Sequence, residues 1–313
     1  MLNAKIENIR EQVAQALVRS LPVGRDDAWI ETLVDQPRFG WDWEALEKGF
    51  FQPLQEWSER HPARLRPILA GLLIDALGQA STRHADLLAA LELQHLASIM
   101  LDDLRNGRDL SEATSSVVTV PLPTWVTIAY NVRQLVPVMI TRQPSELSTV
   151  SRSWLARRFS RFLFQQGLGS ALDLWGSEQE SEHSSEAEFL EHLRLYVGAL
   201  SFGLACDVAS AVAGLDEQAA NSLRSAGIEL GVALRLSAMA QGSSRSLCAQ
   251  DAVSVEQLIR WQRGIDPTRL LPLAQQTMDR ALSMAHVAGP AVTDAFRIFS
   301  SIFEYQACEE KQP

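Results

Sequence analysis

Apolar residues recur every three to four positions along most of the chain, and this spacing constrains the fold more than any other feature. In residues 68–77, ILAGLLIDAL, the apolar side chains fall at positions i, i+1, i+4, i+5, i+8 and i+9, which form one face of an α-helix. The same spacing predicts helices over residues 4–20, 84–105, 152–175, 187–213, 217–240, 254–264, 268–287 and 290–307. The sequence therefore predicts an all-α protein.

Polar, turn-forming residues separate the predicted helices. Asn106-Gly107 is one such break, and an acidic stretch over residues 176–187 and a polar stretch over residues 241–252 predict two loops. Residues 1–45 are expected to form N-terminal helices. The sequence has no repeat of fixed period, and its length suffices for one large buried core. We expect residues 1–313 to form a single domain.

Net charge and apolar length limit the partners of the chain. The formal net charge of −10 argues against binding to nucleic acids or to anionic membrane surfaces, because both attract basic surfaces. The longest apolar stretch, residues 197–215, contains Asp207 and predicts a core helix rather than a membrane span. The N-terminal residues MLNAKIENIREQ lack the apolar core of a signal peptide. We therefore expect a cytoplasmic protein.

The most informative segment is residues 90–110, ALELQHLASIMLDDLRNGRDL. Helical spacing places Glu92, His95, Asp102 and Asp103 on one face. Two adjacent carboxylates at the end of an apolar helix are costly to bury without a cation. Mg²⁺ takes carboxylate oxygens and leaves positions open for phosphate. The pair is a candidate anchor for a metal–diphosphate complex; the alternative is a solvated acidic pair beside a glycine turn.

A second segment, residues 60–78, carries two arginines before a proline. Arg64 and Arg66 precede Pro67, which can open a helix at its first turn because its missing N–H costs nothing there. Guanidinium groups at a helix N-terminus suit a diphosphate, through paired hydrogen bonds and the positive end of the helix dipole. The two arginines are candidate substrate-binding residues; the alternative is a pair of surface arginines.

The order of these segments resembles that of the trans-prenyl diphosphate synthases, the polyprenyl synthetase family of the isoprenoid synthase superfamily. That family carries Gly-Lys-x-x-Arg-Pro, followed further along by Glu-x-x-His-x-x-Ser-x-x-x-Asp-Asp. The chain has matching residues in the same order: Arg66, Pro67, Glu92, His95, Ser98, Asp102 and Asp103. Residues 169–174, GSALDL, are similar to the family's Gly-Gln-x-x-Asp-Leu, and residues 228–242 occupy the place of its second aspartate-rich helix.

This resemblance implies both a fold and a site. The fold is an all-α bundle of the isoprenoid synthase type around a deep central cavity, usually a homodimer. In such enzymes two aspartate clusters hold three Mg²⁺ ions against an allylic prenyl diphosphate, whose ionisation gives a carbocation that isopentenyl diphosphate attacks. The resemblance assigns substrate binding to Arg66 and His95, and metal binding and catalysis to Asp102 and Asp103.

The chain departs from the family pattern at both metal clusters. Asn106 stands where the first cluster has its third aspartate, and Asp109 could replace it as a metal ligand. Ala238 and Met239 stand where the second cluster has its aspartate pair. Because a departing diphosphate needs positive charge, which metal ions supply, and fewer carboxylates remain to hold them, we expect fewer Mg²⁺ ions than the usual three.

Arg235 replaces a glutamine on the helix that has lost its aspartates. A fixed guanidinium can stabilise the charge on a leaving diphosphate, so Arg235 is a further candidate substrate-binding residue. The alternative is a helix-surface arginine paired with an acid such as Glu229 or Asp207.

Three functions are compatible with these residues. The first is an atypical prenyltransferase that uses an allylic prenyl diphosphate through a reduced Mg²⁺ site, and the retained Arg66, His95 and aspartate pair favour it. The second is a catalytically silent or regulatory subunit in a heterodimer with an active synthase. The third is a class I terpene cyclase, for which residues 221–225, NSLRS, are the nearest metal motif but without its closing glutamate.

Overall fold

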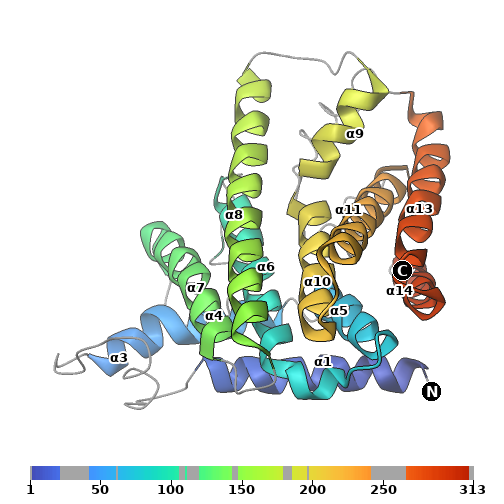
Figure 1. Cartoon of the computed structure of the whole chain (residues 1–313). Coiled ribbons are helices and arrows are strands. Elements are labelled where there is room, and N and C mark those ends of the chain that lie inside the picture. Colours follow the sequence, from blue (N-terminus) through green and yellow to red (C-terminus); the bar gives the residue numbers. More distant parts are fainter. Residues whose placement is uncertain are drawn as a thin grey trace. The chain divides into compact units, whose positions relative to one another are not determined.

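The apolar spacing of the sequence becomes helix throughout the described chain. The structure is a computed structural model that describes residues 2–21, 42–60, 63–105, 110, 120–142, 147–178, 185–195, 197–240 and 266–309. The regular elements within these ranges are all helices, without a strand among them (Figure 1). The all-α prediction is confirmed, whereas the predicted helix 254–264 and loop 241–252 lie outside the described residues.

Contacts between residues divide the chain into two compact units. The first comprises residues 1–67 and 82–144, and the second comprises residues 68–81 and 145–313. Helix α5 (Leu65–Ala76) is divided between them after Pro67. The single domain expected over residues 1–313 stays a prediction.

The first unit contains five further α-helices and a π-helix in its described residues. They are α1 (Leu2–Ser20), α3 (Trp43–Leu46), the π-helix η1 (Glu47–Phe51), α4 (Gln52–Glu59), α6 (Ala85–Arg105) and α7 (Leu122–Arg142). A 3₁₀-helix, η2 (Ser81–His84), begins at the boundary between the units and leads into α6.

Helix α6 forms the centre of the first unit because it is apolar on almost every side. All residues from Leu87 to Met100 are buried, as expected of a helix that neighbours cover completely. Both α1 and α7 pack along α6, and Arg19 of α1 donates a hydrogen bond of 2.8 Å to Asp86 at the start of α6. The unit therefore buries α6 over most of its length.

The second unit holds the remaining described helices. They are α8 (Thr149–Glu178), α9 (Glu186–Leu195), α10 (Val197–Ala213), α11 (Glu217–Ala240), the 3₁₀-helix η5 (Pro267–Arg269), α13 (Leu270–His286) and α14 (Pro290–Glu309). Helices α10 and α11 pack against each other at close range, and α13 packs on α11 (Figure 1).

The close packing of α10 on α11 depends on glycine. A Cβ atom on Gly231 of α11 would lie only 2.5 Å from the Cα atom of Ala199 in α10. Helix α14 joins α10 through an edge-to-face contact of Phe299 with Phe202, whose ring centroids lie 5.6 Å apart. Gly214, with a φ of +65°, ends α10, as glycine commonly does at a helix C-terminus.

Two helix boundaries differ from the prediction. Helix α8 continues to Glu178, into the predicted acidic loop 176–187. The single helix predicted over residues 187–213 was wrong, since α9 ends at Leu195 and α10 begins at Val197. Both helices bury apolar residues at the same spacing, so the periodicity runs through the break without marking it.

Candidate functional site

The twin acids lie in the last two turns of α6 and are buried. Asp102 and Asp103 are each only 6% exposed to solvent, directly after the fully buried run of the helix. The C-terminal end of a helix carries negative partial charge, so buried carboxylates there need a compensating cation. The alternative of a solvated acidic pair is therefore wrong.

Two arginines act on Asp102 from different helices. Arg105, at the end of α6, places its Nη2 atom 3.4 Å from Oδ1 of Asp102. Arg133 comes from α7. Burial lowers the pKa of the Arg133 guanidinium, and the negative charge of Asp102 opposes this effect. Neither arginine was predicted as a site residue: Arg105 follows Asp102 by one turn on the same helix, and the spacing within α6 does not show that Arg133 of α7 acts on it.

The two arginines before Pro67 are buried as well, so they are not a surface pair. Arg64 is 9% exposed and Arg66 1% exposed. The backbone of Arg64 has a φ of +47°, in the left-handed region that costs energy for a residue with a side chain. Helix α5 begins directly after it at Leu65, which places Pro67 within the first turn as predicted.

The Arg64 guanidinium is influenced by an acid of α6. Burial lowers the pKa of its guanidinium, and the charge of Glu92 is the largest influence in the opposite direction. Glu92 and His95 are both buried on α6. Glu92 and Asp102 are ten residues apart on this helix, which corresponds to about 15 Å along its axis. The first unit thus contains two separate groups of acid and arginine. One group includes Glu92 and Arg64, and the other includes Asp102 and Arg105.

Arg235 lies on α11 in the second unit and is only 6% exposed, so it is not a helix-surface arginine. The two acids considered as its partners contact other arginines. Glu229 accepts a hydrogen bond of 2.6 Å from Nε of Arg194 on α9, and this bond raises the pKa of Arg194. Asp207 faces Arg158 and Arg224. The remaining predicted site residue, Asp109, lies outside the described residues.

The twin acids fit Mg²⁺ only if other ligands complete its coordination. Among the described residues no group of three or more His, Cys, Asp or Glu side chains could hold a metal ion. Mg²⁺ is commonly bound by one or two carboxylates, with water and phosphate oxygens filling the rest of an octahedron. Asp102 and Asp103 therefore suit a Mg²⁺ ion shared with a diphosphate rather than one enclosed by protein.

A buried ionic cluster in the second unit was not predicted as a cluster. Asp207 of α10 lies 3.6 Å from Nε of Arg158 on α8 and 3.6 Å from Nη1 of Arg224 on α11. Burial raises the pKa of Asp207 to about 6, against the opposing charges of Arg224, Arg158 and Arg161. Three helices must pack before these side chains meet, so no signal within one segment could have revealed the cluster.

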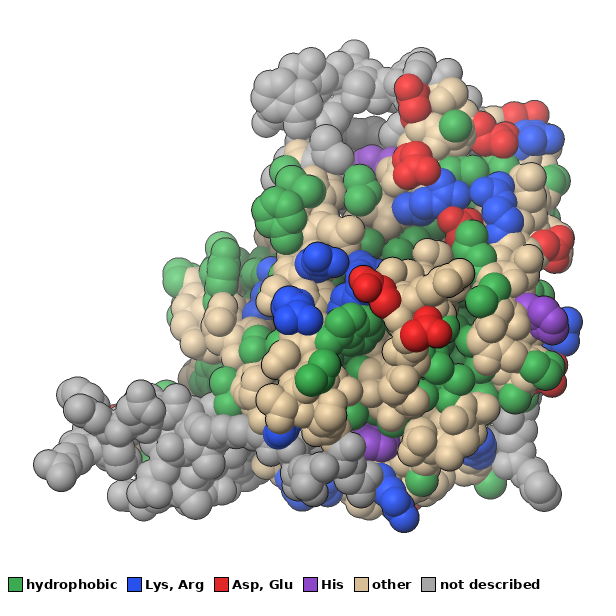
Figure 2. Space-filling view, in the orientation of Figure 1, with side chains coloured by type: hydrophobic (Ala, Val, Ile, Leu, Met, Phe, Trp, Pro, Cys, Tyr) green, Lys and Arg blue, Asp and Glu red, His purple; other side chains and the backbone are tan. Residues whose placement is uncertain are grey.

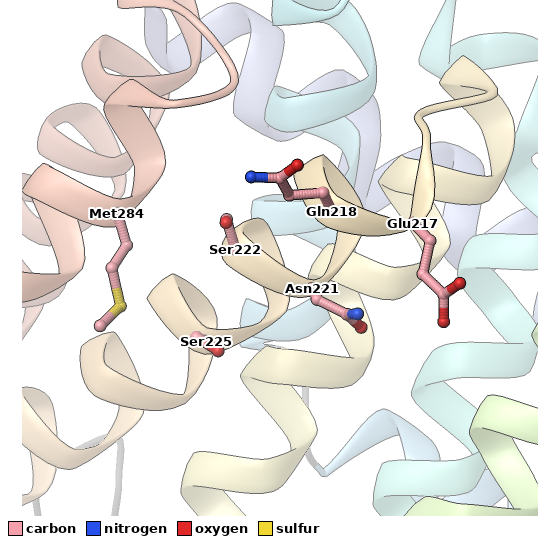
Figure 3. A pocket seen from close by; sticks show the side chains of 6 residues that line it. All are labelled: Glu217, Gln218, Asn221, Ser222, Ser225 and Met284. Atoms are coloured by element: carbon pink, nitrogen blue, oxygen red, sulfur yellow. The ribbon is translucent and has the colours of Figure 1, made fainter.

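A pocket of about 590 Å³ lies between the first half of α11 and Met284 of α13. Its α11 residues are polar, and Figure 3 shows Met284 on the facing helix. The terpene-cyclase motif considered at residues 221–225 borders this pocket, and Glu229 does follow Ser225 by one turn, contrary to our sequence analysis. Oδ1 of Asn221 accepts a hydrogen bond from Arg158, and Glu229 pairs with Arg194.

The surface and the helix lengths add two observations. Figure 2 shows acidic and basic side chains interspersed with apolar ones on one face of the molecule. Within the described ranges, no single helix is long and apolar enough to cross a membrane; α9 and residues 199–213 of α10 meet these criteria only as a bent pair.

Comparisons with solved structures reveal the same fold in prenyl-transferring enzymes. A geranyltransferase from Helicobacter pylori superposes with a TM-score of 0.69 at 14% identity, covering 96% of this chain and 98% of that one. A geranylgeranyl pyrophosphate synthetase from the archaeon Geoglobus acetivorans gives 0.67 at 14% identity, covering 97% and 99%. A geranyltranstransferase from Thermotoga maritima gives 0.66 at 17% identity, covering 99% of both chains.

Sequence comparison identifies the family directly. No curated protein sequence matches the chain. The family model described as Polyprenyl synthetase matches residues 47–237, more than half of the chain, and this family normally uses Mg²⁺. The protein therefore belongs to the polyprenyl synthetase family, has the all-α isoprenoid synthase fold, and is a prenyltransferase.

Proposed function

We propose that the protein is an atypical prenyltransferase that uses an allylic prenyl diphosphate through a reduced Mg²⁺ site on α6. The observation that carries this proposal is the burial of Asp102 and Asp103 near the end of a helix that is buried over most of its length. Buried adjacent carboxylates are costly unless cations pair with them. The allylic substrate class agrees with the solved structures of the same fold, which include geranyltransferases.

In this proposal the residues divide into two roles. Asp102 and Asp103 hold Mg²⁺, with Asp109 as a further candidate ligand, and the number of ions is below the usual three. Mg²⁺, when bound, stabilises the negative charge that develops on the departing diphosphate. The buried side chains Arg64, Arg66 and His95 of the first unit bind a diphosphate group. Arg235, buried in the second unit, is a separate candidate for diphosphate binding.

The reaction breaks the bond between the allylic carbon and the diphosphate oxygen. The electron pair leaves with the diphosphate, whose negative charge the guanidinium groups would stabilise. The electron-rich double bond of an acceptor then attacks the allylic carbocation, and a proton leaves the product. Loss of the second aspartate pair at Ala238 and Met239 supports a greater share of this charge on arginine.

We propose further that the protein is a cytoplasmic homodimer. Two large apolar side chains stand exposed one turn apart on α8, Phe164 at 69% and Leu168 at 48%. Apolar side chains grouped on a surface commonly mark a contact with another protein. A second copy of the chain is the partner that the family resemblance favours.

The direct test is turnover of allylic diphosphates by the purified protein with Mg²⁺, assayed against a panel of acceptors. Asp102→Ala removes one proposed metal ligand and is expected to lower kcat at least about a hundredfold, because charge stabilisation by a bound metal is worth several kcal/mol. Asp86→Ala is the matched control, since Asp86 is an exposed acid at the start of the same helix. Equal turnover by the wild type and Asp102→Ala would contradict the proposed site.

A further inference from the structure

The buried acids of α6 are accompanied by arginines of the same unit. Arg105 lies 3.4 Å from Asp102, and the charges of Glu92 and Asp102 act on Arg64 and Arg133 respectively. An acid pair that served metal binding alone would gain from a strongly negative surrounding, since opposite charge attracts a cation. The arginines around Asp102 instead offset the negative charge of the twin acids.

Two arginines of the described residues interact with the charge of Asp102. Asp102 and Asp103 contribute two negative charges, and Arg105 and Arg133 contribute two positive charges. Compared with an acid pair lacking arginines, this group attracts Mg²⁺ less and attracts a diphosphate more. Arginine also matches phosphate geometry, because its planar guanidinium can donate two parallel hydrogen bonds to one anionic group.

The two arginines approach Asp102 from two helices that pack along each other. Arg105 follows the twin acids on α6, with its side chain 17% exposed, and Arg133 lies in α7, which packs along α6. Tyr130, three residues before Arg133, is 58% exposed, so this part of α7 reaches the surface. Arg105 is therefore partly exposed beside a buried acid, and Arg133 lies on a helix that reaches the surface.

We propose that Arg105 and Arg133 bind the diphosphate of the allylic substrate directly, and that Asp102 positions their guanidinium groups before the substrate arrives. The inference rests on the proposed function. Diphosphate binding replaces the contacts between Asp102 and the guanidinium groups with hydrogen bonds from guanidinium to phosphate. The carboxylate oxygens of Asp102 then become available to Mg²⁺. The positive charges of Arg105 and Arg133 thereby replace part of the charge that the usual three Mg²⁺ ions supply.

The test is calorimetric titration with inorganic pyrophosphate at limiting and at saturating Mg²⁺. Arg133→Gln and Arg105→Gln each remove one guanidinium, and each is expected to weaken pyrophosphate binding about tenfold or more at limiting Mg²⁺, since hydrogen bonds to charged groups carry affinities of this order. At saturating Mg²⁺, the difference in pyrophosphate affinity between each variant and the wild type is expected to be smaller. Arg297→Gln, which removes an exposed arginine of α14, is the control and should bind as the wild type does.

A second readout separates substrate binding from a purely structural role. Without pyrophosphate, both variants should bind Mn²⁺ more tightly than the wild type, measured by electron paramagnetic resonance, because a competing positive charge has gone. Unchanged pyrophosphate and Mn²⁺ affinities in Arg105→Gln would overturn the inference, even if Arg133→Gln does not fold. If the wild type binds an allylic thiolodiphosphate and the variants keep the wild-type affinities for pyrophosphate and Mn²⁺, this inference fails and the proposed function stands. If the wild type does not bind the thiolodiphosphate, both the inference and the proposed function fail.

Discussion

Burial gives Asp102 its significance at the scale of single residues. A carboxylate that is almost fully covered costs several kcal/mol when it has no partner, and Asp102 has Arg105 within 3.4 Å. Substrate binding can replace this ion pair with two other contacts. A metal ion then binds the carboxylate of Asp102, and a phosphate group accepts hydrogen bonds from the guanidinium of Arg105. The residue is thereby suited to a site that fills on substrate binding.

Ligand binding at Asp102 should appear as stabilisation of the folded protein. Mg²⁺ with pyrophosphate is expected to raise the Tm of the wild type, because a ligand present at about a hundred times its Kd adds about 2.7 kcal/mol to the free energy of unfolding. Asp102→Asn should lose most of this rise, measured by scanning calorimetry. Asp86→Asn should retain it. An equal rise in both variants would show that the ligands bind elsewhere.

Asp207 should give the stability of the protein a pH dependence. Its pKa is about 6 in the folded protein against an ordinary value of 3.8, so between these values the folded protein binds more protons than the unfolded one. The contribution of this group to the free energy of unfolding therefore falls as pH rises from about 4 to about 6, by roughly 3 kcal/mol.

Urea denaturation of the wild type and of Asp207→Asn across this pH range measures the effect. The difference in free energy of unfolding, wild type minus variant, should decrease with rising pH. Asp294→Asn changes an exposed acid of α14 and should show little of this dependence. If the difference between the wild type and Asp207→Asn stays constant, or increases with pH, the raised pKa of Asp207 is contradicted.

The sequence revealed some of these residues and not others. Asp102 and Asp103 stand out because adjacent acids interrupt an apolar helix, and the structure buries both. Arg133 does not stand out, because an arginine in α7 is ordinary for a helix that reaches the surface. Asp207 was visible as an interruption of an apolar run and as a candidate partner of Arg235, whereas it faces Arg158 and Arg224. Its role depends on the packing of α8, α10 and α11, which no local pattern specifies.

Helix α8 shows how one glycine can determine the contact between two elements. A Cβ atom on Gly169 would lie 2.6 Å from the backbone oxygen of Leu195, the last residue of α9. Gly167, two residues earlier on the same helix, has no atom within 4 Å of such a Cβ. The helices were predicted from apolar spacing, but this close approach and the break after α9 were not.

The two glycines of α8 form a matched pair of substitutions. Gly169→Ala forces α8 and α9 apart and is expected to lower the free energy of unfolding by about 1–3 kcal/mol, as overpacking does. Gly167→Ala is expected to raise it by up to about 1 kcal/mol, because alanine favours the helix more than glycine. Urea denaturation measures both. A loss of stability in both variants, or a gain in both, would contradict the packing of α8 on α9.

At the scale of the whole molecule, the feature to be tested is the oligomeric state of the active protein. Sequence reasoning reached the fold class because helix-forming spacing covers most of the chain, and it reached the family because several motifs keep their order. Assembly depends on surfaces, and surface residues carry little periodic signal. Phe164 and Leu168 on α8 are the exposed apolar pair from which the homodimer is proposed.

Light scattering after gel filtration tests the homodimer. The wild type is expected at twice the mass of the 34.7 kDa chain, and Phe164→Asp is expected to shift it toward the monomer, because a charge placed in an apolar contact is costly. Val18→Asp changes an exposed apolar residue of α1 and should leave the mass unchanged. Turnover by the homodimer alone would also exclude a silent subunit that needs an active partner.

The most direct test is a crystal structure with Mn²⁺ and an allylic thiolodiphosphate, a substrate mimic that resists ionisation. We expect anomalous scattering from Mn²⁺ at coordination distance from Asp102 and Asp103, with the diphosphate oxygens completing its ligands. A bound mimic whose metal ions contact neither carboxylate would contradict a prenyltransferase site built on these twin acids.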